Sequence, residues 1–261
     1  MPNKLIKQGY KIFALAERGY IWTFTRSSRF WGIVDLSRWR DISPTSSTVP
    51  EMIRRLPGLS GVISQASSYA SGQSSDQTCA QTSGQTSGYI ESYTFLASAT
   101  SHAASHATSQ SSSQSSGQSS GQTTPYTVYM GSYFSTVGLF KALRDIRCGA
   151  CGTTRKSSGI PSYLAELKDH IKSIPWGKLY ASEAEGVLCL VWQDNNITLL
   201  LSTIHWPYHY VKAERKRPAA TSTNAAIARA PFGNNFKEEL NIPKVINDYN
   251  RYMDGAGIAN Q

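Results

Sequence analysis

The stretch Tyr126-Thr-Val-Tyr-Met130, continued by Gly131-Ser-Tyr-Phe134, decides the fold of this chain. Its first residues are mostly β-branched or aromatic, which is typical of a buried strand. Three apolar side chains then recur at helical spacing: Val137, Phe140 and Leu143. Thr136 precedes them as the expected N-cap, which predicts a helix over 136–146. Because Cys148–Thr154 is predicted as the next strand, the whole stretch forms a β-α-β unit.

Further elements are predicted on both sides of this unit. Upstream, Lys11–Phe24 indicates a β-hairpin, and Val49–Leu56 a short helix with Pro50 in its first turn. Downstream, helices are predicted at Ser162–Lys172 and at Lys244–Met253. Between these two helices we expect an antiparallel meander of three strands: Lys178–Ala184, Val187–Gln193 and Ile197–Ile204. The expected class is α/β.

A low-complexity tract separates the upstream elements from the β-α-β unit. Residues 61–125 contain no Lys or Arg, and their only acids are Asp76 and Glu91. Ser, Gln, Thr, Ala and Gly dominate this tract, and the triplet Ser-Gly-Gln recurs in it. Such a composition buries too little apolar surface to offset the entropy of ordering, so we expect disorder. The run Tyr89–Leu96 is the exception, since it could form a transient strand or helix.

The charge of the chain is concentrated outside this tract. The other 196 residues hold all 26 Lys and Arg side chains and 15 of the 17 acids, so their net charge is +11. A polyanionic partner and an ordinary solvated surface both explain such an excess. If the partner is nucleic acid, the expected contacts are the clustered basic side chains: Arg155, Lys156, Lys212, Arg215, Lys216 and Arg217.

Cysteine and histidine spacing points to no chemistry of its own. Four scattered cysteines do not make a disulfide framework, so we expect a reducing, intracellular compartment. Neither a membrane helix nor a signal core is predicted. The pair Cys148 and Cys151 with His205 and His209 could suggest zinc, but buried cysteines and partly exposed histidines explain the same residues. Ser, His and Asp occur without the spacing of a hydrolase triad. Trp176 and Trp192 are expected to be hydrophobic anchors.

Several stretches together resemble a known family. They are Gly9–Tyr20, Tyr126–Phe134, Gly149–Arg155, Gly186–Asp194, Arg217-Pro218, Thr221–Ala225 and Asp248-Tyr-Asn250. In these stretches the chain resembles the piggyBac-type transposases. The resemblance implies an RNase H-like catalytic core interrupted by a β-rich insertion, and DNA as the partner.

The resemblance also implies where catalytic acids belong. In that family, acids hold two Mg²⁺ ions on either side of a scissile phosphate. The first acid lies upstream of the segment that matches Pro2–Lys4. The later acids correspond to Gly131, Gly257 and Asn260, and none of these residues carries a carboxylate. We therefore expect no catalytic residue, no metal site and no cofactor. Asp254 is expected to be a solvated residue at a helix end rather than a displaced ligand.

These observations predict five regions. They are 1–58, the first part of the core; 59–125, the disordered insertion; 126–175, the core β-α-β-α; 176–242, the β-rich insertion with a basic loop; and 243–261, the final core helix. A core without its upstream strand is expected to expose a pairing edge.

The predicted function is that of an inactive, non-enzymatic remnant of a truncated transposase. Weak DNA binding is the expected residual property, and nuclear localisation would follow from it. A co-opted DNA- or protein-interaction module and a fragment of a larger transposase coding sequence are the alternatives.

Overall fold

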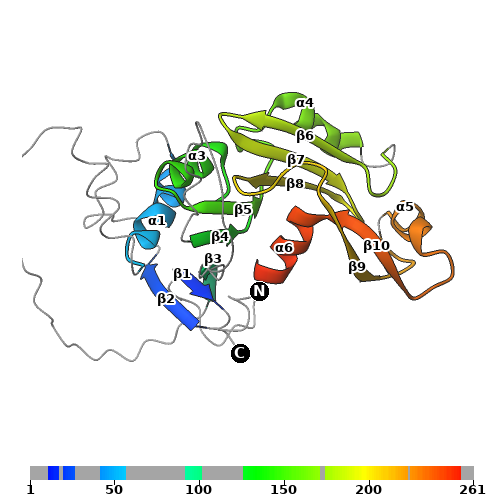
Figure 1. The fold of residues 1–261 in the computed structure, drawn as a ribbon, viewed down its shortest axis with the longest axis horizontal. Helices are drawn as coiled ribbons and strands as arrows, with labels where there is room; N and C mark the ends of the chain where they lie inside the picture. The colour runs from blue at the N-terminus through cyan, green and yellow to red at the C-terminus, as the bar shows by residue number, and fades with distance from the viewer. Residues whose placement is uncertain are drawn as a thin grey trace, which may run out of the picture.

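The computed structural model describes residues 11–17, 20–26, 42–56, 92–101, 126–170, 174–222 and 224–253. Its centre is a mixed eight-stranded sheet in the order β2-β1-β3-β4-β5-β8-β7-β6, beside a two-stranded β9–β10 ribbon (Figure 1). The strands are β1 (Lys11–Glu17), β2 (Tyr20–Arg26), β3 (Ser92–Ser101), β4 (Tyr126–Met130), β5 (Gly149–Thr153), β6 (Leu179–Ala184), β7 (Val187–Gln193), β8 (Ile197–Ser202), β9 (Tyr210–Lys216) and β10 (Lys237–Pro243). The class is mixed α/β, as the sequence predicts.

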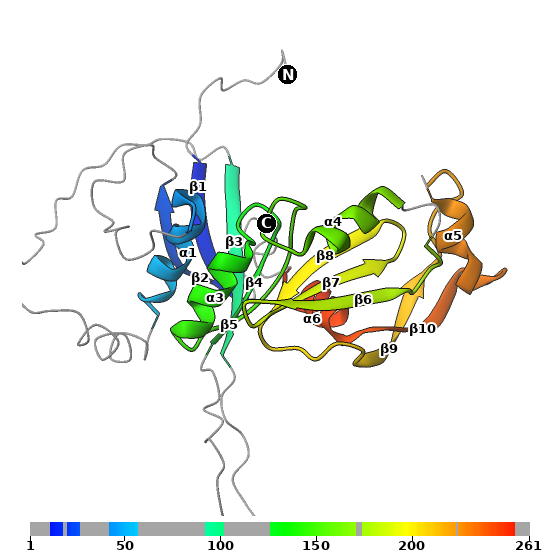
Figure 2. The ribbon, with the colours of Figure 1, turned by 90° about the horizontal axis from the view of Figure 1, so that it is seen from above.

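Helices cover both faces of the large sheet. They are α1 (Pro44–Ile53), α3 (Val137–Asp145), α4 (Ser162–Glu166), α5 (Ala225–Arg229) and α6 (Lys244–Met253), with 3₁₀ turns at Leu167–His170 and Ala230–Phe232. Helices α1 and α3 lie on one face and α6 on the other (Figure 1). Figure 2 shows the β9–β10 ribbon and α5 at the end of the molecule away from α1. Within the described ranges, every helix is too short or too polar to span a bilayer.

The alternation of side chains along each strand builds two hydrophobic cores. Val128 and Met130 of β4 join the core under α1 and α3. Tyr129, between them, points to the opposite face and joins the core under α6. Trp192 is fully buried in this second core, where its ring lies 6.2 Å from that of Trp176. The two tryptophans are therefore hydrophobic anchors, as predicted.

Local sequence signals explain where the helices begin. Thr136 caps α3, because its side chain accepts a hydrogen bond from the backbone N–H of Leu139 at 3.2 Å. The position of α1 corrects the prediction. This helix begins at Pro44 with Ser43 as its N-cap, so Pro50 lies in the helix interior and not in the first turn. The Ser-Thr run before Val49 is part of this helix, and its hydroxyl groups donate to helix carbonyls, including Ser47 Oγ to Pro44 O at 2.8 Å.

Strand β3 lies inside the tract that the composition assigns to disorder. It pairs in parallel with β1 and antiparallel with β4, so it occupies the place between them. It overlaps the short Tyr89–Leu96 run that the sequence singles out. The prediction of disorder over 59–125 is thus wrong for Ser92–Ser101, and the strand extends beyond the Tyr89–Leu96 run. Pairing on both sides supplies the backbone hydrogen bonds that composition cannot predict. The rest of the tract lies outside the described residues.

The predicted meander and last helix are confirmed by the structure, whereas the predicted loop at the basic segment is not. Strands β6, β7 and β8 are antiparallel neighbours, and α6 spans the predicted residues. The segment Lys212–Arg217, predicted as a loop, is mostly strand β9, which pairs antiparallel with β10. Alternating charged side chains conceal a strand pattern, because the exposed face of a two-stranded ribbon can be wholly polar.

Candidate functional site

The end of β4 meets the end of α6 at Gly131. A Cβ atom added to Gly131 would lie 3.7 Å from Cε of Met253, the last residue of α6, which is an ordinary van der Waals contact. A side chain at this position would therefore have room. A side chain at position 131 would point toward the C-terminal end of α6. The family resemblance places the next two acids after this helix end. Those positions, Gly257 and Asn260, lie outside the described residues, as does Asp254.

A tight turn follows Gly131 and brings an arginine to this corner. The carbonyl of Gly131 accepts hydrogen bonds from the backbone N–H of Phe134 at 3.2 Å and from Oγ of Ser135 at 3.0 Å. The ring of Tyr133, in the same turn, lies 5.7 Å from the guanidinium carbon of Arg155. Arg155 is exposed in the segment after β5, so a cation stands beside the corner.

A second glycine, Gly152, lies opposite Met130 in the β4–β5 register. A Cβ atom there would approach the carbonyl oxygen of Met130 to 2.5 Å and Oγ of Ser135 to 2.6 Å. Real Cβ atoms do not come this close to backbone oxygens, so this position requires glycine. Packing therefore requires glycine at position 152 but not at position 131.

Asp248 is the acid that α6 directs toward the sheet. Its Oδ2 atom accepts hydrogen bonds from Nζ of Lys244 at 2.7 Å and from Nε2 of His205 at 3.2 Å, and its side chain is 13% exposed. Burial alone would raise the pKa of Asp248, but these two hydrogen bonds lower it. Asp248 is therefore an ionised carboxylate whose charge is already matched by Lys244.

His205 connects Asp248 to the end of β8. Oγ of Ser202 accepts hydrogen bonds from the backbone N–H groups of Ile204 and His205, both at 3.2 Å. The Ser202 hydroxyl therefore donates to Nδ1 of His205 at 2.7 Å, which leaves the ring proton on Nε2 facing Asp248. Burial lowers the pKa of His205, so its neutral form is favoured.

Ser202, His205 and Asp248 form a chain of polar groups that the sequence does not predict. His205 and Asp248 are 43 residues apart, and no local spacing indicates their contact. The order Ser, His, Asp resembles a hydrolase triad, but Ser202 is fully buried and its oxygen already accepts two N–H groups. It cannot reach a substrate. The network joins β8 to α6, and its role is structural.

The cysteines do not form a reactive or metal-binding pair. Cys148 and Cys151 belong to different cores, so their side chains point to opposite faces of the sheet. Burial raises the pKa of Cys148 to about 12 and also raises that of Cys151, which keeps both thiols protonated. Both ring nitrogens of His205 are hydrogen-bonded. The described part of the chain contains no group of three His, Cys, Asp or Glu side chains that could hold a metal ion. Cys79 lies outside it.

The predicted basic residues lie in two separate places. Arg155 and Lys156 follow β5, and Lys156 forms an ion pair with Asp169. Hydrogen bonding to Lys156 in turn lowers the pKa of Asp169. Lys212, Arg215, Lys216 and Arg217 lie on or directly after β9.

On the ribbon, strand alternation divides the basic cluster between two faces. Lys212 and Lys216 are exposed on one face, where Lys212 pairs with Glu239 of β10 at 3.3 Å. Arg215 turns to the other face and pairs with Asp194, its guanidinium carbon 5.9 Å from the Trp192 ring. Arg217 donates to the carbonyl of Gly233 at 2.9 Å. The ribbon therefore mixes both charges and carries no continuous basic stripe.

Comparison with known proteins identifies the family. The family model described as Transposase IS4, the piggyBac-type group, matches residues 86–261, which is more than half of the chain. The chain belongs to the piggyBac-type IS4 transposase family. A cryo-EM structure of a piggyBac transposase synaptic complex with hairpin DNA is similar, with 16% identity and a TM-score of 0.32. The match covers 50% of this chain and 22% of that one. A search of curated proteins gave no match.

The paired Mg²⁺ ions that the family resemblance implies do not fit the residues that the structure describes at this corner. Gly131 has no side-chain oxygen, although several carboxylates are needed to balance two closely spaced cations. The carboxylate that α6 does supply, Asp248, is bound to Lys244 and His205. A cation would have to displace the Lys244 ammonium to reach it. The described residues of this transposase-family chain therefore offer no ligand set for the metal pair.

Proposed function

We propose that this chain is a transposase-derived domain that has lost phosphodiester chemistry and keeps weak, sequence-independent contact with DNA. The observation that carries the proposal is Gly131, a position with room for a side chain but without one, at the corner where family resemblance expects an aspartate. Because a Cβ atom at this position would make only an ordinary contact, packing does not require glycine there, which supports a change in function at this position.

We infer further that β1, β2, β4, β5 and α3 correspond to the RNase H-like core, and the β-strands between α4 and α6 to its insertion. The path of the chain supports this reading. After the meander and the ribbon, α6 returns to pack against β3, β4 and β5. An inserted region is expected to leave and re-enter a core in this manner.

The test of lost chemistry is a cleavage assay on supercoiled plasmid and on a hairpin-ended oligonucleotide, with Mg²⁺ or Mn²⁺. We expect no product above background from the natural chain or from Gly131→Asp, because one restored carboxylate cannot hold two ions. Cleavage that depends on metal, disappears in Asp248→Asn and persists in the exposed control Asp169→Asn would overturn the proposal. Melting curves of all variants establish that each is folded.

The DNA contact is proposed on charge and position. Arg155 lies beside the Gly131 turn, and Lys216 is exposed on the ribbon. Arg155, Lys156, Lys212, Lys216 and the partly engaged Arg215 and Arg217 would meet phosphates, with dissociation constants of roughly 10⁻⁴ to 10⁻⁶ M. The nucleus is the compartment in which such a contact would operate. Fluorescence anisotropy with unrelated DNA duplexes at several salt concentrations tests this contact. An affinity that does not change with salt concentration would contradict a phosphate contact.

A further inference from the structure

The loop after β8 exposes two large aromatic side chains without a folding reason. Trp206 is 80% exposed and Tyr208 is 61% exposed, whereas Trp192 and Trp176 are used as anchors of a core. Exposed tryptophan contributes little to stability, and tryptophan and tyrosine are the side chains most enriched at the energetic centres of interfaces. Their position on one loop indicates a binding surface.

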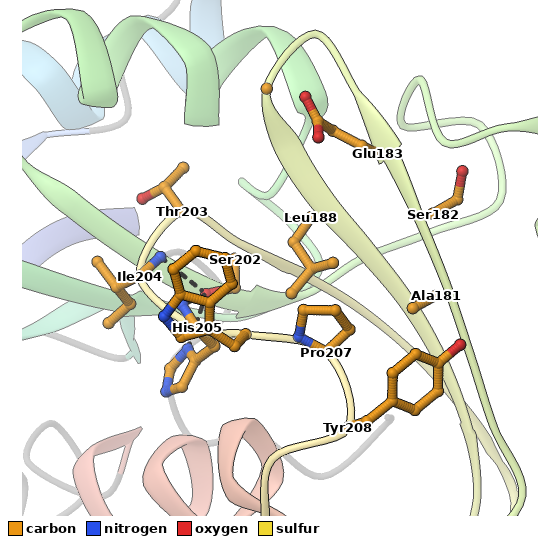
Figure 3. A pocket seen from close by; sticks show the side chains of 12 residues that line it. Ala181, Ser182, Glu183, Leu188, Ser202, Thr203, Ile204, His205, Pro207 and Tyr208 are labelled. Atoms are coloured by element: carbon orange, nitrogen blue, oxygen red, sulfur yellow. Dashed lines mark hydrogen bonds between the residues drawn. The ribbon is translucent and has the colours of Figure 1, made fainter.

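The loop is held in place by the Ser202 network. Oγ of Ser202 fixes the backbone N–H groups of Ile204 and His205, as the dashed lines in Figure 3 show, and the His205 ring anchors the loop to Asp248 of α6. At the far end, the carbonyl of His209 accepts a hydrogen bond from Lys244 N at 2.7 Å. Tyr208 has a left-handed φ of 62°, which is unusual for a residue other than glycine. A fixed loop loses little entropy on binding.

A hollow of about 670 Å³ lies between this loop and the β6–β7 hairpin. Figure 3 shows Glu183 at one end of the hollow and Tyr208 at the other, with Leu188 and Pro207 between them in this view. The volume falls within the range of ligand-sized sites. Its lining includes the apolar side chains of Leu188 and Pro207 and the aromatic side chains of Trp206 and Tyr208.

The charge of the hollow decides which ligand it can take. Glu183 is the one charged side chain among its lining residues, since His205 is held neutral, and the lining contains neither Lys nor Arg. Glu183 is exposed and makes no ion pair with the described residues. Two cations stand at the adjacent turn, where Lys141 pairs with Glu185 at 2.8 Å and Arg144 donates to the Gly186 carbonyl at 2.6 Å. A phosphate in the hollow would therefore meet the Glu183 carboxylate, while the cations at the adjacent turn are already engaged.

We propose that this hollow is a docking site for an extended peptide in which Lys or Arg stands next to apolar residues. The basic side chain pairs with Glu183 at one end of the hollow, and the apolar neighbours cover Leu188 and Pro207 and pack against the exposed aromatic rings. This function is separate from DNA contact, because an acidic, aromatic hollow on a basic protein selects the opposite charge of ligand.

The experiment uses a positional-scanning library of amidated hexapeptides, with one residue fixed at a time, and reads binding by fluorescence polarisation. Variants Trp206→Ala and Glu183→Gln are compared with matched controls Phe236→Ala and Glu166→Gln. Phe236 is exposed like Trp206, and Glu166 is an exposed acid outside the hollow. Because all four side chains are exposed, their variants are expected to melt like the natural chain.

We expect libraries with fixed Lys or Arg to bind best, and both hollow variants to weaken that binding at least fivefold while the controls leave it unchanged. The citrulline analogue of the best arginine peptide should bind the natural chain more weakly, and Glu183→Gln should reduce that difference. Absence of saturable binding, preference for acidic peptides, or equal loss in the control variants would overturn the proposal. Displacement of the peptide by single-stranded DNA in a Trp206-dependent manner would also overturn it, and would assign the hollow to nucleic acid.

Discussion

Gly131 and Gly152 lie at the ends of neighbouring strands, yet the molecule needs only one of them. At Gly152 a methyl group would press against the backbone oxygen of Met130 at 2.5 Å, whereas at Gly131 it would make a normal contact at 3.7 Å. Neither residue has a left-handed backbone, so conformation does not explain either glycine. The comparison teaches that packing imposes one glycine and leaves the other unexplained, which is why the proposed loss of chemistry rests on Gly131.

The largest expected effect is a difference in unfolding free energy between alanine variants of the two glycines. Gly152→Ala is expected to lower the free energy of unfolding by about 3 kcal/mol, because the Met130 carbonyl belongs to the sheet and cannot move aside. Gly131→Ala should change it by no more than about 0.5 kcal/mol. Urea denaturation followed by circular dichroism measures both values. Equal losses in the two variants would show that packing also requires glycine at 131.

The acid that remains on α6 should prove structural. Asp248→Ala is expected to cost about 2 kcal/mol of unfolding free energy, since it leaves Lys244 and the buried His205 ring without their acceptor. Asp145→Asn, an exposed acid of α3, is the control and should have little effect. The same denaturation experiment measures both. An unchanged stability in Asp248→Ala would remove the contrast between a missing catalytic acid and a retained structural one.

The pH dependence of stability tests the neutral state of His205. Burial lowers the pKa of His205 in the folded chain below its ordinary value of 6.5, so just below that pH the unfolded chain binds a proton that the folded chain does not. The unfolding free energy should therefore be highest above pH 6.5 and fall as the pH drops toward the pKa of folded His205. The loss is about 1.4 kcal/mol for each pH unit between the pKa values of the unfolded and folded chains. Thermal melts between pH 7.5 and 5 should show a shallower slope for His205→Gln. Parallel slopes would contradict the assignment.

The smallest effects concern DNA. Arg155→Ala, beside the Gly131 turn, should weaken binding to an unrelated duplex two- to threefold and reduce the salt slope by about 1. Lys212→Ala should change the affinity less, because Lys212 is already paired with Glu239. Anisotropy titrations at several salt concentrations measure both. A larger loss in Lys212→Ala would move the proposed DNA contact from the β4–α6 corner to the ribbon.

Local patterns predict much of the fold, and the exceptions have physical reasons. The apolar periodicity of Val137, Phe140 and Leu143 and the Thr136 cap depend on neighbouring residues, so α3 is readable in the sequence. Strand β3 is not, since its order depends on two partners distant in the chain. Four of the six predicted basic residues cluster at 212–217 in the sequence, but strand alternation and acids from β10 divide this cluster.

Some features of the candidate site can likewise be predicted from the sequence, and others depend on the fold. The motif alone predicts that Gly131 stands where the family resemblance expects a carboxylate, whereas the room around Gly131 depends on the packing of α6. The Ser202–His205–Asp248 chain and the hollow beside Trp206 are assembled from segments with no shared local pattern. The sequence analysis identifies neither Trp206 and Tyr208 as exposed nor the surface that they border, because both depend on the assembled fold.

Strand β3 also sets limits on how this chain can change over generations. Because it is hydrogen-bonded to β1 on one side and β4 on the other, it divides the Ser-Gly-Gln repeats into two spacers of independent length. Lengthening a spacer adds closure entropy only with the logarithm of its length, so gains and losses of repeats should accumulate freely. We expect natural length variants to differ before Ser92 or after Ser101, and to leave the ten residues between those limits intact.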